Sequence, residues 1–105
     1  MKRPKRINID PFDYEVRYMP EFSATTNTMG SCVTDAQIIF IDAGLTDQAE
    51  KDTVLHEALH GAWSQTGLQK SYNEDQQEEV IWALTPRLLA IIRDNPELIQ
   101  WLSGR

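Results

Sequence analysis

Two histidines and a glutamate in the middle of the chain have the types and the spacing needed to bind a metal ion and to act on its water. His56 and His60 are four residues apart, in the sequence His-Glu-Ala-Leu-His. Residues four apart lie on the same face of a helix, so both imidazoles can reach one metal ion. Glu57 follows His56 directly, and a carboxylate there can act as general base on a metal-bound water. The motif predicts metal-dependent hydrolysis, with Glu57 as the catalytic residue.

A third metal ligand must come from another part of the chain, because a catalytic zinc usually takes three protein ligands and keeps one position for water. The chain has two histidines and one cysteine, which leaves Cys32 or a carboxylate. The carboxylate candidates on the next expected helix are Glu74, Asp75, Glu78 and Glu79. Glu78 continues the apolar stripe of that helix, whereas Glu79 lies about 100° round it and is expected to face solvent. We predict Glu78 as the ligand and keep Glu79 as the alternative; Glu78 as a carboxylate that only stabilises the helix dipole is the other interpretation.

The metal motif lies on a segment with the sequence properties of a helix. Residues 47–66 contain no proline and no glycine except Gly61, and Thr46 is a favourable N-cap. Gly67 is expected to end the helix. Apolar residues recur at helical spacing and place the histidines at the edge of a buried stripe, which consists of Leu55, Ala58, Leu59 and Ala62.

Two further helices are expected after the motif. The first covers residues 73–92, and its buried stripe should consist of Ile81, Leu84, Leu88 and Ile91. Pro86 lies inside this segment and is expected to kink or split the helix. Asn95 and Pro96 begin a short last helix, whose packing residues should be Leu98, Trp101 and Leu102.

Three short segments before the motif have the patterns of β-strands. They cover residues 14–18, 32–34 and 37–41, and the last is β-branched and almost wholly apolar. Short connections favour antiparallel pairing, and residues 21–30 indicate a loop. The expected fold class is therefore α+β: a small N-terminal antiparallel sheet of about three strands, then the metal-site helix, a ligand-bearing helix and a short C-terminal helix.

Length, charge and cysteine content narrow the class of protein. The 105 residues suffice for one small domain, expected over residues 14–105, after a flexible basic tail over residues 1–13. The net charge of -6 makes a nucleic-acid partner unlikely. One cysteine, no secretory signal and no long apolar stretch favour a cytoplasmic protein without a membrane partner.

The order of these features carries a resemblance to a known family. Two strands precede the His56-Glu57-x-x-His60 helix, Glu78-x-x-Ile81 follows on the next helix, and the end reads Asp94-Asn95-Pro96-Glu97-Leu98. Over about residues 30–102 this resembles the ImmA/IrrE-type metallopeptidases, zinc-dependent gluzincin-like enzymes, and most of all their short phage- or prophage-encoded forms. The resemblance implies Zn²⁺ held by His56, His60 and Glu78, Glu57 as general base, and a protein or peptide substrate such as a repressor.

A second class of function uses the same ligands. A regulatory, protein-binding module of a phage or mobile element would keep the zinc without turnover, but it would not need Glu57, which binds no metal in this motif. For an enzyme, Tyr72 is a candidate donor to the developing oxyanion, although a packing aromatic is the ordinary interpretation. An exposed edge of the strand over residues 37–41 is expected to hold an extended peptide by strand addition.

Overall fold

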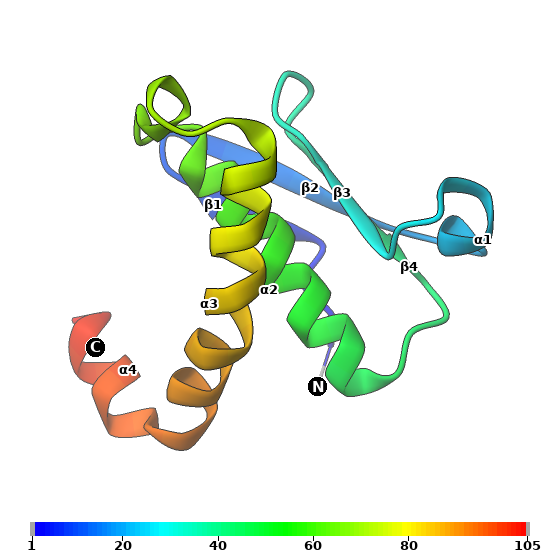
Figure 1. Cartoon of the computed structure of the whole chain (residues 1–105). Helices are drawn as coiled ribbons and strands as arrows, with labels where there is room; N and C mark the ends of the chain where they lie inside the picture. The colour runs from blue at the N-terminus through cyan, green and yellow to red at the C-terminus, as the bar shows by residue number, and fades with distance from the viewer. Residues whose placement is uncertain (1, 105) are drawn as a thin grey trace.

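A four-stranded mixed sheet forms the first part of this computed structural model, which describes residues 2–104 (Figure 1). Its strands are β1 (Arg6–Ile9), β2 (Phe12–Met19), β3 (Gly30–Val33) and β4 (Ile38–Asp42), in the order β1-β2-β4-β3. The β1–β2 and β3–β4 pairs are antiparallel, but β2 and β4 run parallel. The α+β class is confirmed, whereas a purely antiparallel sheet of three strands was wrong. Met1 of the expected tail and Arg105 of the expected domain lie outside the described residues.

A short helix within the expected loop, α1 (Phe22–Thr26), explains the parallel pair. It takes the chain from the end of β2 to the far edge of the sheet, and β3 then turns into β4, which lies between β3 and β2. Asp42, at the end of β4, fixes this connection by accepting hydrogen bonds from the backbone N–H and the hydroxyl of Ser23. The ring of Phe22 stacks on that of Phe40, with 5.9 Å between centroids.

The expected basic tail is instead attached to the domain. Its second half forms β1, which pairs with β2. Before β1, the guanidinium of Arg3 lies 4.8 Å from the ring centroid of Tyr18, and its Nε lies 2.9 Å from Oε1 of Glu50. The Tyr18 hydroxyl donates a hydrogen bond of 2.7 Å to the carbonyl of Pro4. The domain therefore begins before residue 14, because partners far along the chain hold this segment.

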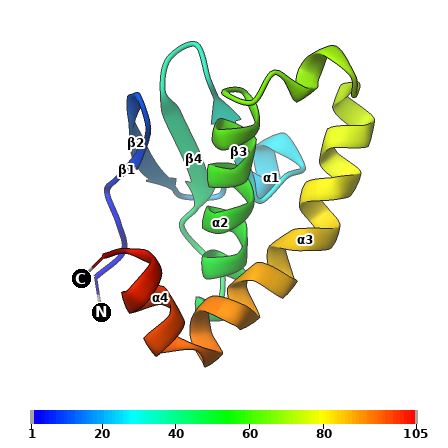
Figure 2. The same cartoon turned by 90° about the vertical axis from the view of Figure 1, so that its left-hand side faces the viewer.

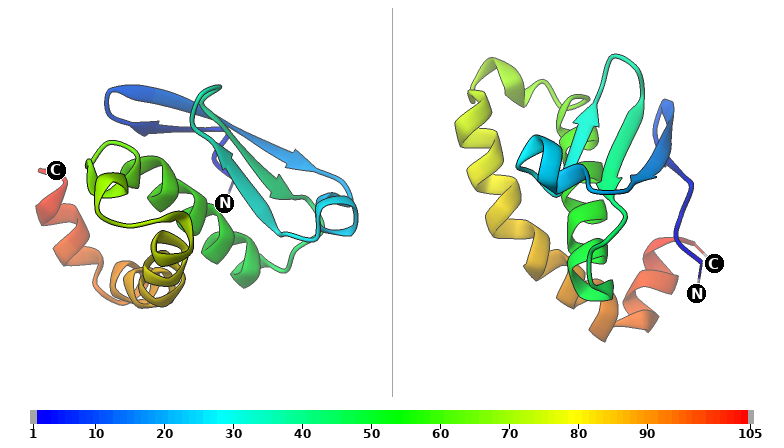
Figure 3. Two further views of the ribbon diagram at one scale, coloured as in Figure 1. Left: turned by 45° about the horizontal axis from the view of Figure 1, so that its top comes forward. Right: turned by 90° about the vertical axis from the view of Figure 1, so that its right-hand side faces the viewer.

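The core lies between the sheet and α2 (Asp47–Trp63), which packs across one sheet face (Figure 3). Alternate strand residues point to this face, and its most buried members are Tyr14, Val16, Ile39 and Ile41. A Cβ on Gly30 would lie 2.8 Å from Cγ2 of Thr53 and 3.0 Å from the carbonyl oxygen of Phe40. Glycine at this position lets β3 press directly onto α2 beside the metal motif.

The remaining helices are the short 3₁₀ helix η1 (Leu68–Lys70) and the α-helices α3 (Glu74–Asp94) and α4 (Pro96–Leu102). Gly67, with φ of 79°, makes the left-handed turn that leads from the end of α2 into η1. Asn73 and Gln76 form a reciprocal capping box at the start of α3. Figure 2 shows α3 beside α2, with α4 turning back at the far end of α3.

Helix α3 differs from its expected pattern. It runs unbroken through Pro86, so the expected split is absent, and the Thr85 hydroxyl donates to the carbonyl of Ile81. Leu84 and Ile91 of the expected buried stripe are 50% and 45% exposed, because α3 packs on α2 along a narrow strip. The expected packing of α4 is also wrong for two residues, since Trp101 is 76% and Leu102 64% exposed.

Across residues 2–104, no helix has both the length and the apolar composition that crossing a membrane requires.

Candidate metal centre

The metal motif lies on the covered side of α2. His56 and Glu57 are 8% and 7% exposed, and the other buried residues of this helix are Thr53 and Gly61. His56 therefore belongs to the buried face, and His60 is partly buried beside it. The reason is that β3 packs onto α2 at Gly30, which covers this side of the helix.

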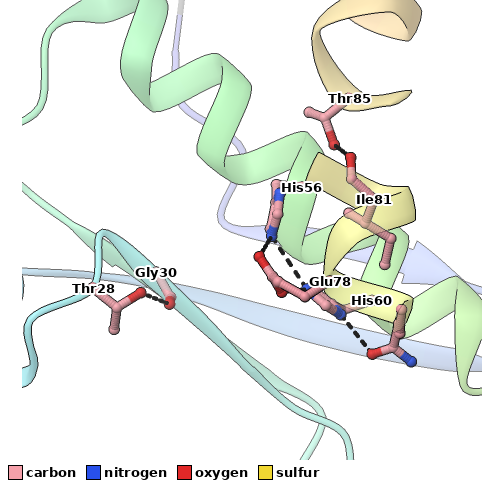
Figure 4. A network of polar contacts seen from close by, with 8 residues as sticks. Thr28, Gly30, His56, His60, Glu78, Ile81 and Thr85 are labelled. Carbon is pink, nitrogen blue, oxygen red and sulfur yellow. Dashed lines mark hydrogen bonds and ion pairs between the residues drawn. The ribbon is translucent and has the colours of Figure 1, made fainter. Parts of the chain in front are cut away.

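Three side chains meet between α2 and α3 (Figure 4). The Nε2 atoms of His56 and His60 lie 3.2 Å apart. From α3, the carboxylate of Glu78 places Oε1 2.9 Å from His56 Nε2 and Oε2 2.8 Å from His60 Nε2. One ligand atom from each residue lies within 4.8 Å of the others, so these three residues can hold a metal ion.

Gln77 contacts the ring nitrogen of His60 that faces away from Glu78. Its Oε1, an acceptor, lies 2.8 Å from Nδ1 of His60, a contact that favours the tautomer with the proton on Nδ1. Nε2 of His60 then has a free lone pair, and this lone pair faces the Glu78 carboxylate and Nε2 of His56. In this tautomer, Nε2 of His60 and Oε2 of Glu78 both offer lone pairs to a cation placed between them. A hydrogen bond at the other ring nitrogen is also how proteins usually orient a metal-binding histidine.

The spacing of the ligand atoms suits a tetrahedral site. Metal–ligand bonds of about 2.0–2.1 Å at tetrahedral angles separate the ligand atoms by about 3.3 Å. The observed separations of 2.8, 2.9 and 3.2 Å are slightly shorter, so a small outward movement would accommodate the ion. Burial lowers the pKa of His56 against the opposing effect of the Glu78 carboxylate, which favours the neutral imidazole that binds metals. Three ligands leave a coordination position for water or substrate.

Glu57 has the environment expected of a general base. Its side chain is buried between α2 and β3, with Cγ 3.1 Å from the position of a Cβ on Gly30. Burial raises the pKa of Glu57 to about 7; the charge of His60 opposes this rise and that of Glu78 adds to it. A carboxyl group that titrates near neutral pH can both accept and return a proton.

A cleft of about 670 Å³ is lined by His56, Glu57 and His60 of the motif and by Glu78. Its walls come from β3, α2 and the first half of α3. Two of its residues escaped the sequence prediction: Gln77, and Trp82, whose ring centroid lies 6.1 Å from that of His56. Gln77 and Trp82 reach the histidines through the packing of α3 on α2, which no spacing along the chain predicts.

Cys32, the other candidate ligand, lies on β3 in the wall of the cleft. Among the described residues, the metal-binding group consists of the two histidines and Glu78, without this thiol. Burial, with a contribution from the charge of Glu57, raises the pKa of Cys32 to about 12.

We expect Cys32 to react slowly with iodoacetamide at pH 8, because very little thiolate is present. Alkylation of the folded protein, followed by mass spectrometry, should be at least about 100-fold slower than for a free cysteine of pKa about 8.5. Unfolding in urea should restore the ordinary rate. Rapid labelling of the folded chain would show that the thiol is ionised and that its surroundings differ from these.

The other expected site residues lie elsewhere. Glu79 and Asp75 are exposed and do not line the cleft, whereas Glu74 lies at its rim. Tyr72 packs edge-on against Trp63, with 5.8 Å between ring centroids. This contact fits the interpretation of Tyr72 as a packing aromatic. The expected edge strand over residues 37–41 is wrong, because β4 is paired on both sides and β3 forms the free edge.

The arrangement as a whole consists of a metal-binding group, a buried carboxylate next to it and a free strand edge along one cleft. Such an arrangement can activate water against a carbonyl held beside the metal. No family model, curated protein or solved structure matches the chain, so its function has to be inferred from these residues.

Proposed function

We propose that this protein is a zinc-dependent peptidase of the gluzincin-like, ImmA/IrrE-resembling kind. The observation that carries the proposal is the meeting of His56, His60 and Glu78 beside the buried carboxylate of Glu57. A site that only bound metal would have no use for a buried glutamate without a ligand role. Burying a carboxylate costs free energy, so its presence supports catalysis.

Zinc is the proposed ion because of the donor set. Two histidines and one glutamate form one of the common catalytic zinc sites, which keep one position open. The single cysteine supports a reducing compartment, and we place the protein in the cytoplasm as part of this proposal.

His56, His60 and Glu78 would hold the ion, which would supply Lewis-acid polarisation of the scissile carbonyl and of the attacking water. Gln77 would favour the His60 tautomer that exposes Nε2. Glu57 accepts the proton of the attacking water and delivers it to the leaving amine.

The free edge of β3 supports a peptide as the substrate. β3 lines the cleft along Gly30, Ser31 and Cys32, and its other edge pairs with β4. An extended peptide can add to such an edge through main-chain hydrogen bonds, which would hold it beside the metal centre. A cytoplasmic protein, such as the repressor that the family resemblance implies, is the proposed substrate.

The test is hydrolysis by the zinc-loaded protein. Unfolded casein and a mixed peptide library, incubated near pH 7.5 and read by mass spectrometry, should yield new peptide ends. A chelator should stop cleavage, and added zinc should restore it. Tight zinc binding without any cleavage would instead favour the non-catalytic, protein-binding module.

Gln77→Ala should weaken zinc binding without abolishing it. Loss of the hydrogen bond to His60 releases the ring and its tautomer, and such outer partners are typically worth 10- to 100-fold in metal affinity. Competition with a chromophoric chelator measures the change. Gln48→Ala, at an exposed position on the first turn of α2, is the matched control and should bind as wild type. Equal affinity in both variants would show that Gln77 does not support the site.

A further inference from the structure

A second hollow lies on the opposite side of the α2–α3 pair. We call it the outer groove; its volume is about 180 Å³, and its lining includes Leu59, Ala62, Thr66, Val80, Leu84 and Leu88. On α2, Leu59 and Ala62 lie about 200° and 140° round the helix from Glu57, which faces β3. The outer groove therefore opens away from Glu57 and from β3.

Helix α4 presents an apolar face that is largely exposed among the described residues. Leu98, Trp101 and Leu102 are spaced at i, i+3 and i+4, which places them on one face of the helix. They are 40%, 76% and 64% exposed. We call these three side chains the α4 face.

The α4 face is too far along the chain to fill its own outer groove. Pro96, where α4 begins, is separated from Leu84 by a length of α3 of about 18 Å and from Val80 by about 24 Å. The seven residues of α4 span only about 10 Å. Figures 1 and 2 show α4 at the far end of α3, away from the half of α3 that pairs with the end of α2.

The exposed apolar area is large enough for a stable interface. Leu84, which lines the outer groove, is 50% exposed, and Ile91 and Ile92, which follow the last groove residue of α3 and precede α4, are 45% and 43% exposed. Together with the α4 face, these three side chains form a patch of six. With about 100 Å² for each side chain, the exposed area of the patch is about 600 Å², which is the upper end for a monomer. One partner in a standard interface buries roughly 800 Å². Exposed charges of opposite sign flank its two parts, Arg87 beside the outer groove and Glu97 on α4.

We propose that two copies of this chain associate through this patch, with the α4 face of each seated in the outer groove of the other. Each copy carries both the groove and the helix that fills it, so a two-fold axis makes both contacts at once. The cleft with the metal centre lies on the other side of α3 and stays open in this dimer. The proposal holds whether or not the chain hydrolyses peptides.

The experiment is sedimentation velocity on the purified chain between about 1 and 100 µM. Wild type should sediment as a dimer, and Trp101→Glu and Leu84→Glu should each weaken association at least about 10-fold. Both positions are exposed, so circular dichroism should be unchanged. Trp82→Glu is the matched control: the same change on α3, 64% exposed, but beside the cleft, and it should leave the dimer intact.

Mixing the two variants tests the reciprocal contact. The Trp101→Glu variant has an unaltered outer groove, and the Leu84→Glu variant has an unaltered α4 face. One intact contact, between that groove and that face, can therefore form in the mixed dimer. The mixture should associate more tightly than either variant alone. A monomeric wild type at all concentrations, a dimer that survives both substitutions, or a mixture no tighter than its parts would each overturn the proposal.

Discussion

Replacing Glu78 by alanine should remove most of the bound zinc. Its two carboxylate oxygens lie 2.9 and 2.8 Å from the Nε2 atoms of His56 and His60, so the variant loses the ligand that α3 contributes. We expect the zinc affinity to fall by more than the 10- to 100-fold that is typical when a residue hydrogen-bonded to a metal ligand is removed. Elemental analysis of protein purified without a histidine tag should give about one zinc per chain in wild type and far less in the variant.

Glu79→Ala provides the matched control for this experiment. It removes the same group from the next residue of α3, where the side chain is exposed and outside the cleft. Its zinc content should equal that of wild type. Full zinc retention in Glu78→Ala would place the third ligand elsewhere, and no zinc in wild type after reconstitution would remove the basis of the proposed function.

Glu57→Gln should abolish peptide hydrolysis and leave zinc bound. The amide keeps the size of the side chain but cannot accept the proton of water, and a general base typically contributes about 10²- to 10⁴-fold. Initial rates on a peptide that the wild type cleaves, together with zinc content, separate this effect from loss of the metal. A variant with full activity and full zinc would assign the base to another residue.

The stability of the metal-free protein gives the control for Glu57→Gln. Burial raises the pKa of Glu57 to about 7, so the folded state favours the protonated form. The charged carboxylate therefore destabilises the fold increasingly as pH rises from about 4.5 towards 7, by up to about 3 kcal/mol. Above pH 7, the neutral amide should be at least as stable as wild type in thermal unfolding, so loss of activity cannot be attributed to unfolding.

The residues that share a helix face were predictable from the sequence, and those brought together by packing were not. His56 and His60 are four apart on α2, and Glu78 is three residues before Ile81 on α3, so helical periodicity alone brings them to the facing sides of two helices. Gln77 and Trp82 reach the histidines because of the way α3 lies on α2. No pattern within one helix contains that information.

The order of the strands shows the same distinction at a larger scale. Each strand over residues 12–42 was found near its place, since alternation and β-branching are local. The parallel pairing of β2 with β4 depends on α1, which takes the chain past the position that β4 later fills. β1 pairs with β2 close by along the chain, but the segment before it is held by Arg3, whose partner Glu50 lies 47 positions away.

A metal ion held between α2 and α3 would be a part of the tertiary structure. Ile81 and Thr85 are the buried residues of α3, yet its partner helix supplies two of the three ligands and α3 the third. A bound ion would thus crosslink the two helices in addition to their side-chain packing. Because an ion that binds only this folded arrangement stabilises it by mass action, removal of the metal should loosen α3 before it disturbs the sheet, and hydrogen exchange should rise first in α3.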